Sequence, residues 1–239
     1  MKQLSRRFKE IEEKEKKGAH GSWRKEFCRK YPEVLVRIQH NTYNSLVEKL
    51  SSKGESITCR KGCTHCCFHY VAVSLAHGLL IVDYLYKNNE LLRKFLNNYE
   101  KWHRMGHSIS NSIDHARIQA LSSSMPIDRV IAETRPLSER YLNMNIQCPF
   151  LEDRRCFIYE VRPLSCSGHY SASPPDWCAP GARQKPVIHH MIPRDEDLME
   201  IMRLVDPRMT LYELTLPAMI HKLLTEGSSS VMSEMAQHN

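Results

Sequence analysis

The positions of the cysteines constrain this chain more than any other feature. Nine cysteines occur in 239 residues, and four of them fall within nine positions, in the run Cys-Arg-Lys-Gly-Cys-Thr-His-Cys-Cys at 59–67. Three more follow at 148, 156 and 166, and Cys178 lies a little further on. Loops can supply soft thiolates spaced in this way to a zinc ion or an iron–sulfur cluster. The spacing therefore predicts a fold in which two distant segments meet at a metal centre.

The first cluster also indicates how its thiolates would be used. Cys63 and Cys66 have the Cys-x2-Cys spacing that lets two thiolates reach one centre from a tight turn, and Gly62 permits that turn. Cys66 and Cys67 are adjacent, which suits two atoms of a cluster or two neighbouring sites better than one ion. Scattered buried thiols or a redox dithiol are two other interpretations. Neither explains the second cluster about eighty residues further on.

Composition excludes several classes of protein. Hydrophobic residues make up 41% of the chain and charged residues 26%, which excludes a wholly disordered chain. The best apolar run, Val71–Val82, contains Ser74 and His77 and is shorter than the roughly 20 residues of a membrane span. The first 18 residues contain no apolar segment of the signal-peptide type. We therefore expect a cytoplasmic protein whose cysteines serve metal or redox chemistry rather than disulfides.

The net charge of +7 is concentrated at the N-terminus. Residues 1–30 hold 11 Lys and Arg and 5 Glu, a balance of +6, which leaves +1 for the rest of the chain. Nucleic-acid-binding proteins usually spread basic residues, with aromatic residues between them, over one face. Here Lys and Glu alternate over 10–17, which predicts a solvated helix. An RNA-binding zinc module would rest on this segment alone, so we expect neither nucleic acid nor a membrane as partner.

Apolar periodicity predicts helices over most of the chain outside one stretch. Ser74 is the expected N-cap of an apolar helix, Pro32 suits a first turn, Pro217 predicts a kink, and the tail from Gly227 should fray. Residues 143–194 instead hold seven prolines and four cysteines, a density that excludes long helices. The helices are expected over 1–19, 32–50, 75–89, 90–103, 109–121, 127–141, 195–205 and 211–224.

These patterns predict a mostly α fold, in which a helical domain carries an irregular, cysteine-rich metal-binding lobe. The chain divides into a basic helical extension at 1–55, a cysteine-cluster metal-binding domain at 56–180, and C-terminal helices and a tail at 181–239 that would pack with the core as one unit. The proline-rich stretch should be organised by the metal, so that metal binding contributes to folding.

Taken together, the two clusters resemble the cysteine-cluster proteins of the YkgJ/FliB type, which are described as zinc- or iron-chelating. That family has the pattern Cys-x2-Cys-x2-Cys-Cys, then Cys-Pro-[aromatic/Leu]-Leu, a short insert, and Cys-x-[Ile/Val]-Tyr-x-x-Arg-Pro-x-x-Cys. The first part departs from it, because three residues rather than two separate Cys59 from Cys63. The resemblance covers about 59–178, and its second part matches at Cys148, Pro149, Phe150, Leu151, Cys156, Ile158, Tyr159, Arg162, Pro163 and Cys166.

The resemblance implies a metal-binding protein with zinc or an iron–sulfur cluster as cofactor. We favour iron–sulfur, because the cysteines outnumber the four of one structural zinc site. Zinc remains the alternative if eight thiolates form two four-cysteine sites. The expected ligands are Cys59, Cys63, Cys66, Cys67, Cys148, Cys156, Cys166 and Cys178.

One branch of the family is similar to the flagellin lysine N-methylases, which are thought to use S-adenosylmethionine with an iron–sulfur cluster. The alternative function is therefore a metal-dependent protein-modifying enzyme, such as an S-adenosylmethionine-dependent protein lysine N-methylase with a protein substrate. The sequence contains no Gly-rich strand–loop–helix of the Rossmann type, and the run of strands and helices that a radical-enzyme barrel needs does not follow the first cluster. No catalytic residue can be assigned.

Residues near the cysteines are expected to support the centre rather than to bind it. Tyr159 and Arg162 lie between two expected ligands, and Arg162 could bond metal-bound sulfur, pair with Glu160 or Asp153, or cap the carbonyls of a turn. Pro163 should end a single helical turn.

Histidines and one further cysteine complete the expectations. His65, His69 and His169 should lie around the centre or at the surface, with His169 the best further ligand, because it follows Cys166 by three residues. The pair at 189–190 should be exposed. Cys28, far from both clusters, should be a packed or free thiol.

Overall fold

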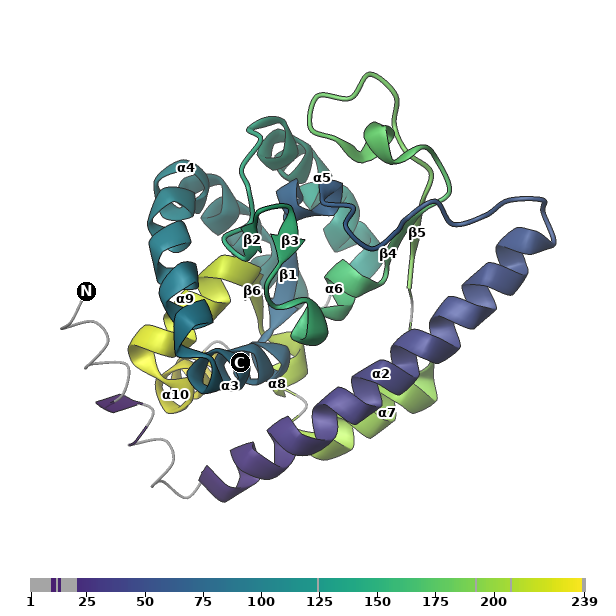
Figure 1. Ribbon diagram of the computed structural model, residues 1–239. Coiled ribbons are helices and arrows are strands. Elements are labelled where there is room, and N and C mark those ends of the chain that lie inside the picture. Colours follow the sequence, from purple (N-terminus) through teal and green to yellow (C-terminus); the bar gives the residue numbers. More distant parts are fainter. Residues whose placement is uncertain are drawn as a thin grey trace.

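The computed structural model describes residues 10, 11, 13, 21–123, 125–191, 193–206 and 208–237, so the helix expected over 1–19 lies largely outside the described residues. The fold is mostly helical, as predicted (Figure 1). The longer helices are α2 (Gly21–Ser51), α3 (Leu75–Lys87), α4 (Asn89–Ser122), α5 (Ile127–Asn143), α7 (Asp195–Leu204), α9 (Leu216–Glu226) and α10 (Ser228–Gln237).

Helix α3 is the centre of the core. It is apolar over most of its surface, with the Asp83–Lys87 ion pair toward solvent, and Leu75, Leu79, Ile81 and Leu85 are each at most 1% exposed. So much apolar surface must be covered, and α2, α4 and α9 pack against it. Its predicted N-cap is confirmed, since the Ser74 hydroxyl accepts a hydrogen bond from the backbone N–H of the third helical residue.

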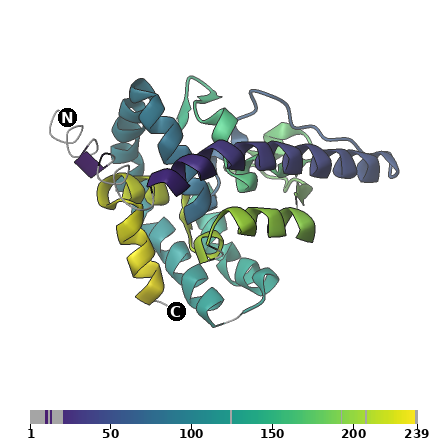
Figure 2. The ribbon, with the colours of Figure 1, turned by 90° about the horizontal axis from the view of Figure 1, so that it is seen from below.

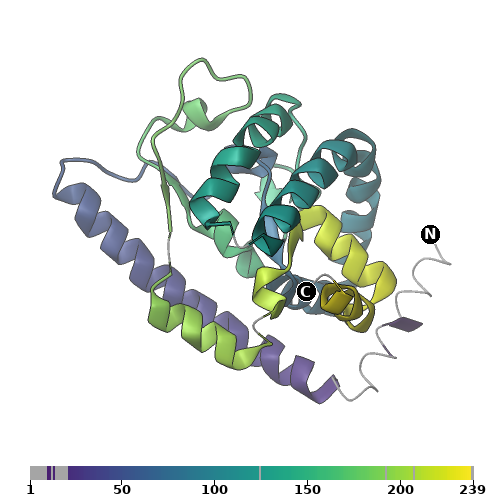
Figure 3. The same cartoon turned by 180° about the vertical axis from the view of Figure 1, so that it is seen from behind.

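Two predictions about helix boundaries are wrong because burial outweighs local signals. Pro32 lies inside α2 rather than in its first turn. Phe27, Tyr31 and Leu35 are at least 96% buried on one face of that helix, and their packing outweighs the roughly 3 kcal/mol cost of an internal proline. Helix α4 is continuous where two helices were expected, because Ile113 continues its buried face. Figures 2 and 3 show α2 running alongside α7 and extending past the rest of the molecule.

The C-terminal segment also differs from expectation. Pro217 produces no kink inside a helix, because the chain is extended up to Thr215 and Pro217 stands in the first turn of α9, where its missing N–H costs nothing. The tail expected to fray from Gly227 is helix α10, which buries Val231 completely.

The prediction that 143–194 lacks long helices is confirmed. This stretch contains β2 (Leu151–Glu152), β3 (Arg155–Cys156), η2 (Tyr159–Val161), α6 (Leu164–Ser167), β4 (His169–Ser171), η3 (Pro175–Cys178) and β5 (Ile188–His190). The remaining short elements are η1 (His65–Phe68), β1 (Ala72–Ser74), α8 (Arg208–Leu211) and β6 (Glu213–Thr215).

The strands form three antiparallel pairs, β1 with β6, β2 with β3, and β4 with β5. One hydrophobic core, which extends from Phe27 to Val231, takes side chains from all three segments into which the sequence divides. In the part of the chain that is described, no helix combines the length and apolarity needed to cross a membrane.

Candidate metal centre

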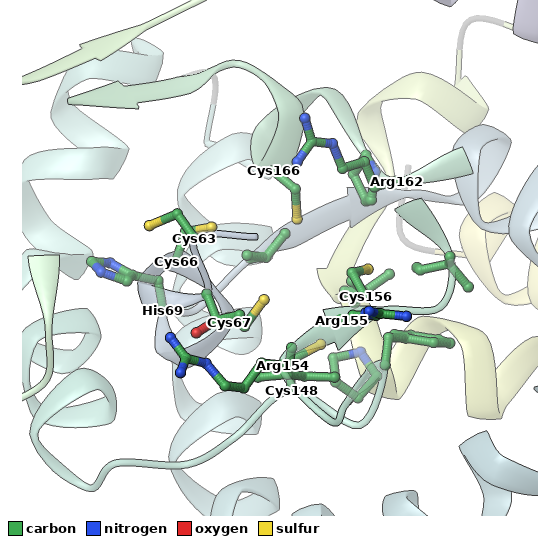
Figure 4. A pocket seen from close by; sticks show the side chains of 18 of the residues that line it. Cys63, Cys66, Cys67, His69, Cys148, Arg154, Arg155, Cys156, Arg162 and Cys166 are labelled. Carbon is green, nitrogen blue, oxygen red and sulfur yellow. The ribbon is translucent and has the colours of Figure 1, made fainter. Parts of the chain in front are cut away.

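Six cysteines, three from each sequence cluster, line one cavity of about 300 Å³. They are Cys63, Cys66, Cys67, Cys148, Cys156 and Cys166. Figure 4 shows Cys67, Cys148, Cys156 and Cys166 around the space, with Cys63 and Cys66 together on one side. Segments about eighty residues apart in the sequence thus meet at a common space, as the cysteine spacing predicts.

The first wall of the cavity is a tight loop that leads into η1. Gly62 has φ +92°, a conformation that side chains rarely adopt, and a hydrogen bond of 3.0 Å from Cys63 N–H to the Arg60 carbonyl closes the turn. The Cys67 N–H then donates to the Thr64 carbonyl at 2.9 Å. These bonds present three cysteine side chains from the five residues Cys63–Cys67.

The second wall is the β2–β3 hairpin. Asp153 and Arg154 form its two-residue turn with φ of 47° and 58°, the backbone that matches the twist of a tight hairpin. Leu151 is paired with Cys156 across the hairpin. The Cys148 N–H donates to the Cys67 carbonyl at 2.8 Å, which joins this wall to the first.

The third wall is the single turn that the sequence predicts before Pro163. It is present as η2, and α6 begins directly after the proline. The Cys166 N–H donates to the Pro163 carbonyl at 2.9 Å, which fixes the backbone that carries the thiol. Further lining residues include His69 just after η1, Tyr141 of α5, and Thr215, Leu216 and Pro217 at the start of α9.

Burial keeps most of these thiols protonated in the absence of a cation. It raises the pKa of Cys148 to about 12, with a further contribution from Cys156, and it also raises the pKa of Cys156 and Cys166. Cys66 differs, because a hydrogen bond from the Cys67 thiol lowers the pKa of Cys66 to about 7, and raises that of Cys67. Binding a metal would displace these protons.

Four cationic side chains line the cavity together with the thiols, and none of the described lining residues is Asp or Glu. The cations are Lys61, Arg154, Arg155 and Arg162. Arg162 lies over the Tyr159 ring at 4.2 Å, and its charge lowers the pKa of Cys66 and Cys156. Among the described residues it makes no ion pair with Glu160 or Asp153. Arg154 and Arg155, in the insert between two cysteines, were missed at the sequence level because no motif marks them.

Cys59 and Cys178 do not line this cavity but lie beside its first wall. The Ser171 N–H donates to Cys59 Sγ at 3.1 Å. Burial raises the pKa of Cys178, and the nearby Cys59, Cys63 and Cys66 raise it further. The eight expected cysteines therefore fall into two groups that meet at Cys66.

The predicted ligand set stays a prediction. Within the described part of the chain, no three Cys, His, Asp or Glu side chains are arranged to hold an ion. The thiols share a cavity, and rotation of their side chains would be needed to bring them to ligand distances. Cys28 is buried and lies apart from both groups, and its thiol faces the Leu79 carbonyl at 3.9 Å, as expected for a packed thiol.

A carboxylate behind the cavity was also missed at the sequence level. Asp114 of α4 is 4% exposed and accepts hydrogen bonds from the Tyr70 hydroxyl and from the N–H and hydroxyl of Thr215, all at 2.8 Å. Tyr70 follows η1 and Thr215 lines the cavity, so Asp114 ties two parts of the site to a core helix.

Comparison of the chain with protein-family models gives no match. Comparisons with curated proteins and with solved structures likewise give none.

Proposed function

We propose that this protein binds metal through the thiolates of its two cysteine clusters, most simply as iron–sulfur centres. The observation that carries the proposal is the cavity of about 300 Å³ that six cysteines share. Its donors are the soft thiolates that zinc and iron–sulfur clusters use, and no carboxylate of the described lining competes. The four cations around it would offset the negative charge of a metal–thiolate centre.

The grouping of the thiols supports two neighbouring centres. Cys67, Cys148, Cys156 and Cys166 lie around the cavity, while Cys63 and Cys66 lie together on one side of it (Figure 4). Cys59 and Cys178 lie outside the cavity, and the charges of Cys63 and Cys66 raise the pKa of both, which groups these four thiols as a second set. Cys66 also influences the pKa of Cys67 and Cys166, so it borders both sets. Each set has the four thiolates that one cluster or one structural zinc requires.

The size of the cavity favours clusters over single ions. The space of about 300 Å³ is many times the roughly 10–15 Å³ that one enclosed water needs, so the cavity has room for more than one zinc ion between four sulfurs. Zinc in two four-thiolate sites is the alternative, and it would use the same ligands.

Anaerobic purification followed by iron, zinc and sulfide analysis tests the metal. We expect brown protein with broad visible absorption that bleaches on reduction. Colourless protein with stoichiometric zinc would replace iron–sulfur by zinc and leave the ligands intact. Protein with neither metal, even after reconstitution under anaerobic conditions, would contradict the proposal.

Paired substitutions test the two sets. Cys148→Ala with Cys166→Ala should remove about half of the bound metal, and Cys59→Ala with Cys178→Ala should remove the other half. Cys28→Ala is the matched control, because it removes a buried thiol away from both sets and should leave the metal content unchanged. A metal content equal to that of the wild type in both double variants would show that these thiols are not ligands.

Metal removal should loosen 167–190 more than 146–161. Phe150 and Ile158 are at most 1% exposed and anchor the earlier segment to the core. The later segment depends more on hydrogen bonds, such as those from the Val187 N–H to the Ser173 hydroxyl and from the Thr58 N–H to the Ser171 carbonyl, both at 2.8 Å. Hydrogen exchange with and without chelator measures the difference, and equal protection of both segments would contradict it.

The alternative function, a metal-dependent protein lysine N-methylase, receives less support from the site. A lysine substrate is cationic, and the cavity has four cationic side chains and no described carboxylate to receive it. The described strands form only antiparallel pairs, unlike the parallel sheet of a doubly wound cofactor domain. Equilibrium dialysis of the metal-loaded protein against S-adenosylmethionine should therefore show no binding, and stoichiometric binding would revive the enzyme hypothesis.

A further inference from the structure

Three histidines from three separate segments of the chain lie beside the cysteine loops. His69 follows η1, His169 lies on β4 and His190 lies on β5. The ring centres of His69 and His169 are 5.4 Å apart, and those of His169 and His190 are 5.1 Å apart. The charge of His190 contributes to lowering the pKa of His69, after burial. None of the three is an expected cysteine ligand, although His69 also lines the thiol cavity and His169 is the histidine that the sequence predicts as a further ligand.

The β4–β5 pair fixes two of these rings. His169 and His190 are direct partners across the antiparallel pair, so their side chains share one face. Gly168 permits the strands to close next to them, because a Cβ there would lie 2.5 Å from the Met191 Cβ. The Met191 N–H donates to the Gly168 carbonyl at 2.6 Å at this closed end.

The separations of the rings match those of imidazoles on one metal ion. With a metal–nitrogen distance of about 2.05 Å and about 1.2 Å from nitrogen to ring centre, each ring centre lies about 3.2 Å from the ion. At a tetrahedral angle, two such rings have centres about 5.2 Å apart. The observed 5.4 Å and 5.1 Å differ from this value by no more than about 0.2 Å.

The described side chains are not arranged to hold an ion, so the three rings must first rotate to turn their nitrogens toward a common point. The Cβ–Cγ bond of histidine points at the ring centre, and rotation about it is soft, so it redirects the nitrogens while the centre stays in place. His169 Nε2 is buried without a hydrogen-bond partner among the described residues, a position that a ligand would satisfy. His69 Nε2 has only a long contact of 3.4 Å, to the Cys178 carbonyl.

We propose that His69, His169 and His190 bind one divalent transition-metal ion of the zinc class, separate from the thiolate centres. Three imidazoles suit zinc and related ions, and they leave a fourth position for water or another ligand. The site goes beyond the proposed thiolate function and does not depend on it, because its donors are nitrogens.

Zinc titration of the anaerobically purified protein, with its thiolate centres as isolated, tests the proposal. Because exposed His103 and His107 of α4 are stacked at 4.3 Å and could bind zinc by themselves, both are first changed to Gln. We expect one additional zinc per chain, with nitrogen and oxygen but no sulfur neighbours in its X-ray absorption spectrum.

Variants then identify the ligands. His190→Ala removes an exposed ring, and His169→Gln keeps most of the buried volume. Each should lower the affinity for the additional zinc more than about 100-fold, because even the loss of a group that orients a ligand lowers metal affinity about 10–100-fold. The exposed His115 of α4 provides the control, and His115→Ala should leave binding unchanged. An unchanged metal content in the thiolate centres shows that each variant is folded.

Two results would overturn the proposal. Sulfur neighbours around the added zinc would place it in the thiolate sets instead. Equal affinity in the wild type, His190→Ala and His169→Gln would identify an adventitious ion only. Neither result depends on whether the thiolates hold iron or zinc, so the failure of this site and the failure of the thiolate proposal are distinguishable.

Discussion

Replacing Asp114 by Asn should remove a specific part of the pH dependence of stability. The carboxylate lies on α4, behind the candidate metal centre, and accepts hydrogen bonds from Tyr70 and Thr215. Burial raises the pKa of Asp114 to about 6 from an ordinary 3.8, against hydrogen bonds from Tyr70 and Thr215 and the charge of Arg117, which lower it. Burial therefore outweighs these partners.

The sign follows from the number of protons bound. Between pH 3.8 and 6 the folded protein holds a proton on Asp114 that the unfolded chain has lost, so stability falls as the pH rises through this window. A difference of about two pKa units corresponds to about 3 kcal/mol over the whole window. Between pH 4.5 and 7 the expected loss is about 2 kcal/mol, because part of the window lies below pH 4.5.

Urea unfolding of the wild type and Asp114→Asn at pH 4.5 and 7 measures this effect. The asparagine keeps an acceptor oxygen but does not titrate, so the stability of the wild type relative to the variant should fall by about 2 kcal/mol between the two pH values. The other groups that titrate in this range cancel in the comparison. Asp128→Asn, at an exposed position in the first turn of α5, is the control and should show no such difference. A wild type that gains stability relative to Asp114→Asn toward pH 7 would refute the reasoning.

Three further predictions concern the cavity and its support. Gly62→Ala and Gly54→Ala should each lower the free energy of unfolding by about 1–2 kcal/mol, because both glycines have positive φ and open space around them. Only Gly62→Ala should lower the metal content, and equal metal loss in both variants would contradict this. In metal-free protein, peptide mapping after iodoacetamide should show Cys66 modified at lower pH than Cys148, because the Cys67 thiol lowers the pKa of Cys66 and burial raises that of Cys148. The reverse order would be a contradiction. Phe150→Ala, at a fully buried position, should destabilise the fold by about 3–5 kcal/mol in thermal or urea unfolding, and a loss below about 1 kcal/mol would contradict its role as an anchor.

Local chemistry explains which parts of the fold the sequence predicts. The N-cap at Ser74 depends on neighbouring residues alone, and so does the absence of long helices through the prolines of 143–194. The two cysteine clusters meet through long-range contacts. Their meeting can still be predicted, because four cysteines within nine residues indicate a metal centre to which the second cluster would supply further thiolates. Whether the thiols bind metal stays a prediction.

The features that were missed depend on pairings between distant residues. Asp114 is an ordinary polar position on a helix until Tyr70 and Thr215 are placed beside it. The histidine pair at 169 and 190 arises from strand register, and three-residue strands carry too little alternation to be recognised in the sequence. His189 was expected to be exposed, yet its Nε2 is buried, because cross-strand pairing places it opposite Tyr170.

The β2–β3 turn shows how a local cost can serve the site. Its two central residues, Asp153 and Arg154, adopt positive φ. This backbone conformation costs about 1 kcal/mol or more for each residue, and an Asn-Gly turn would reduce that cost. An Asn-Gly turn would lack the Arg154 side chain, which lines the cavity together with Cys148 (Figure 4). The strained turn thus brings two cysteine backbones together and places a cation where thiolate charge would gather.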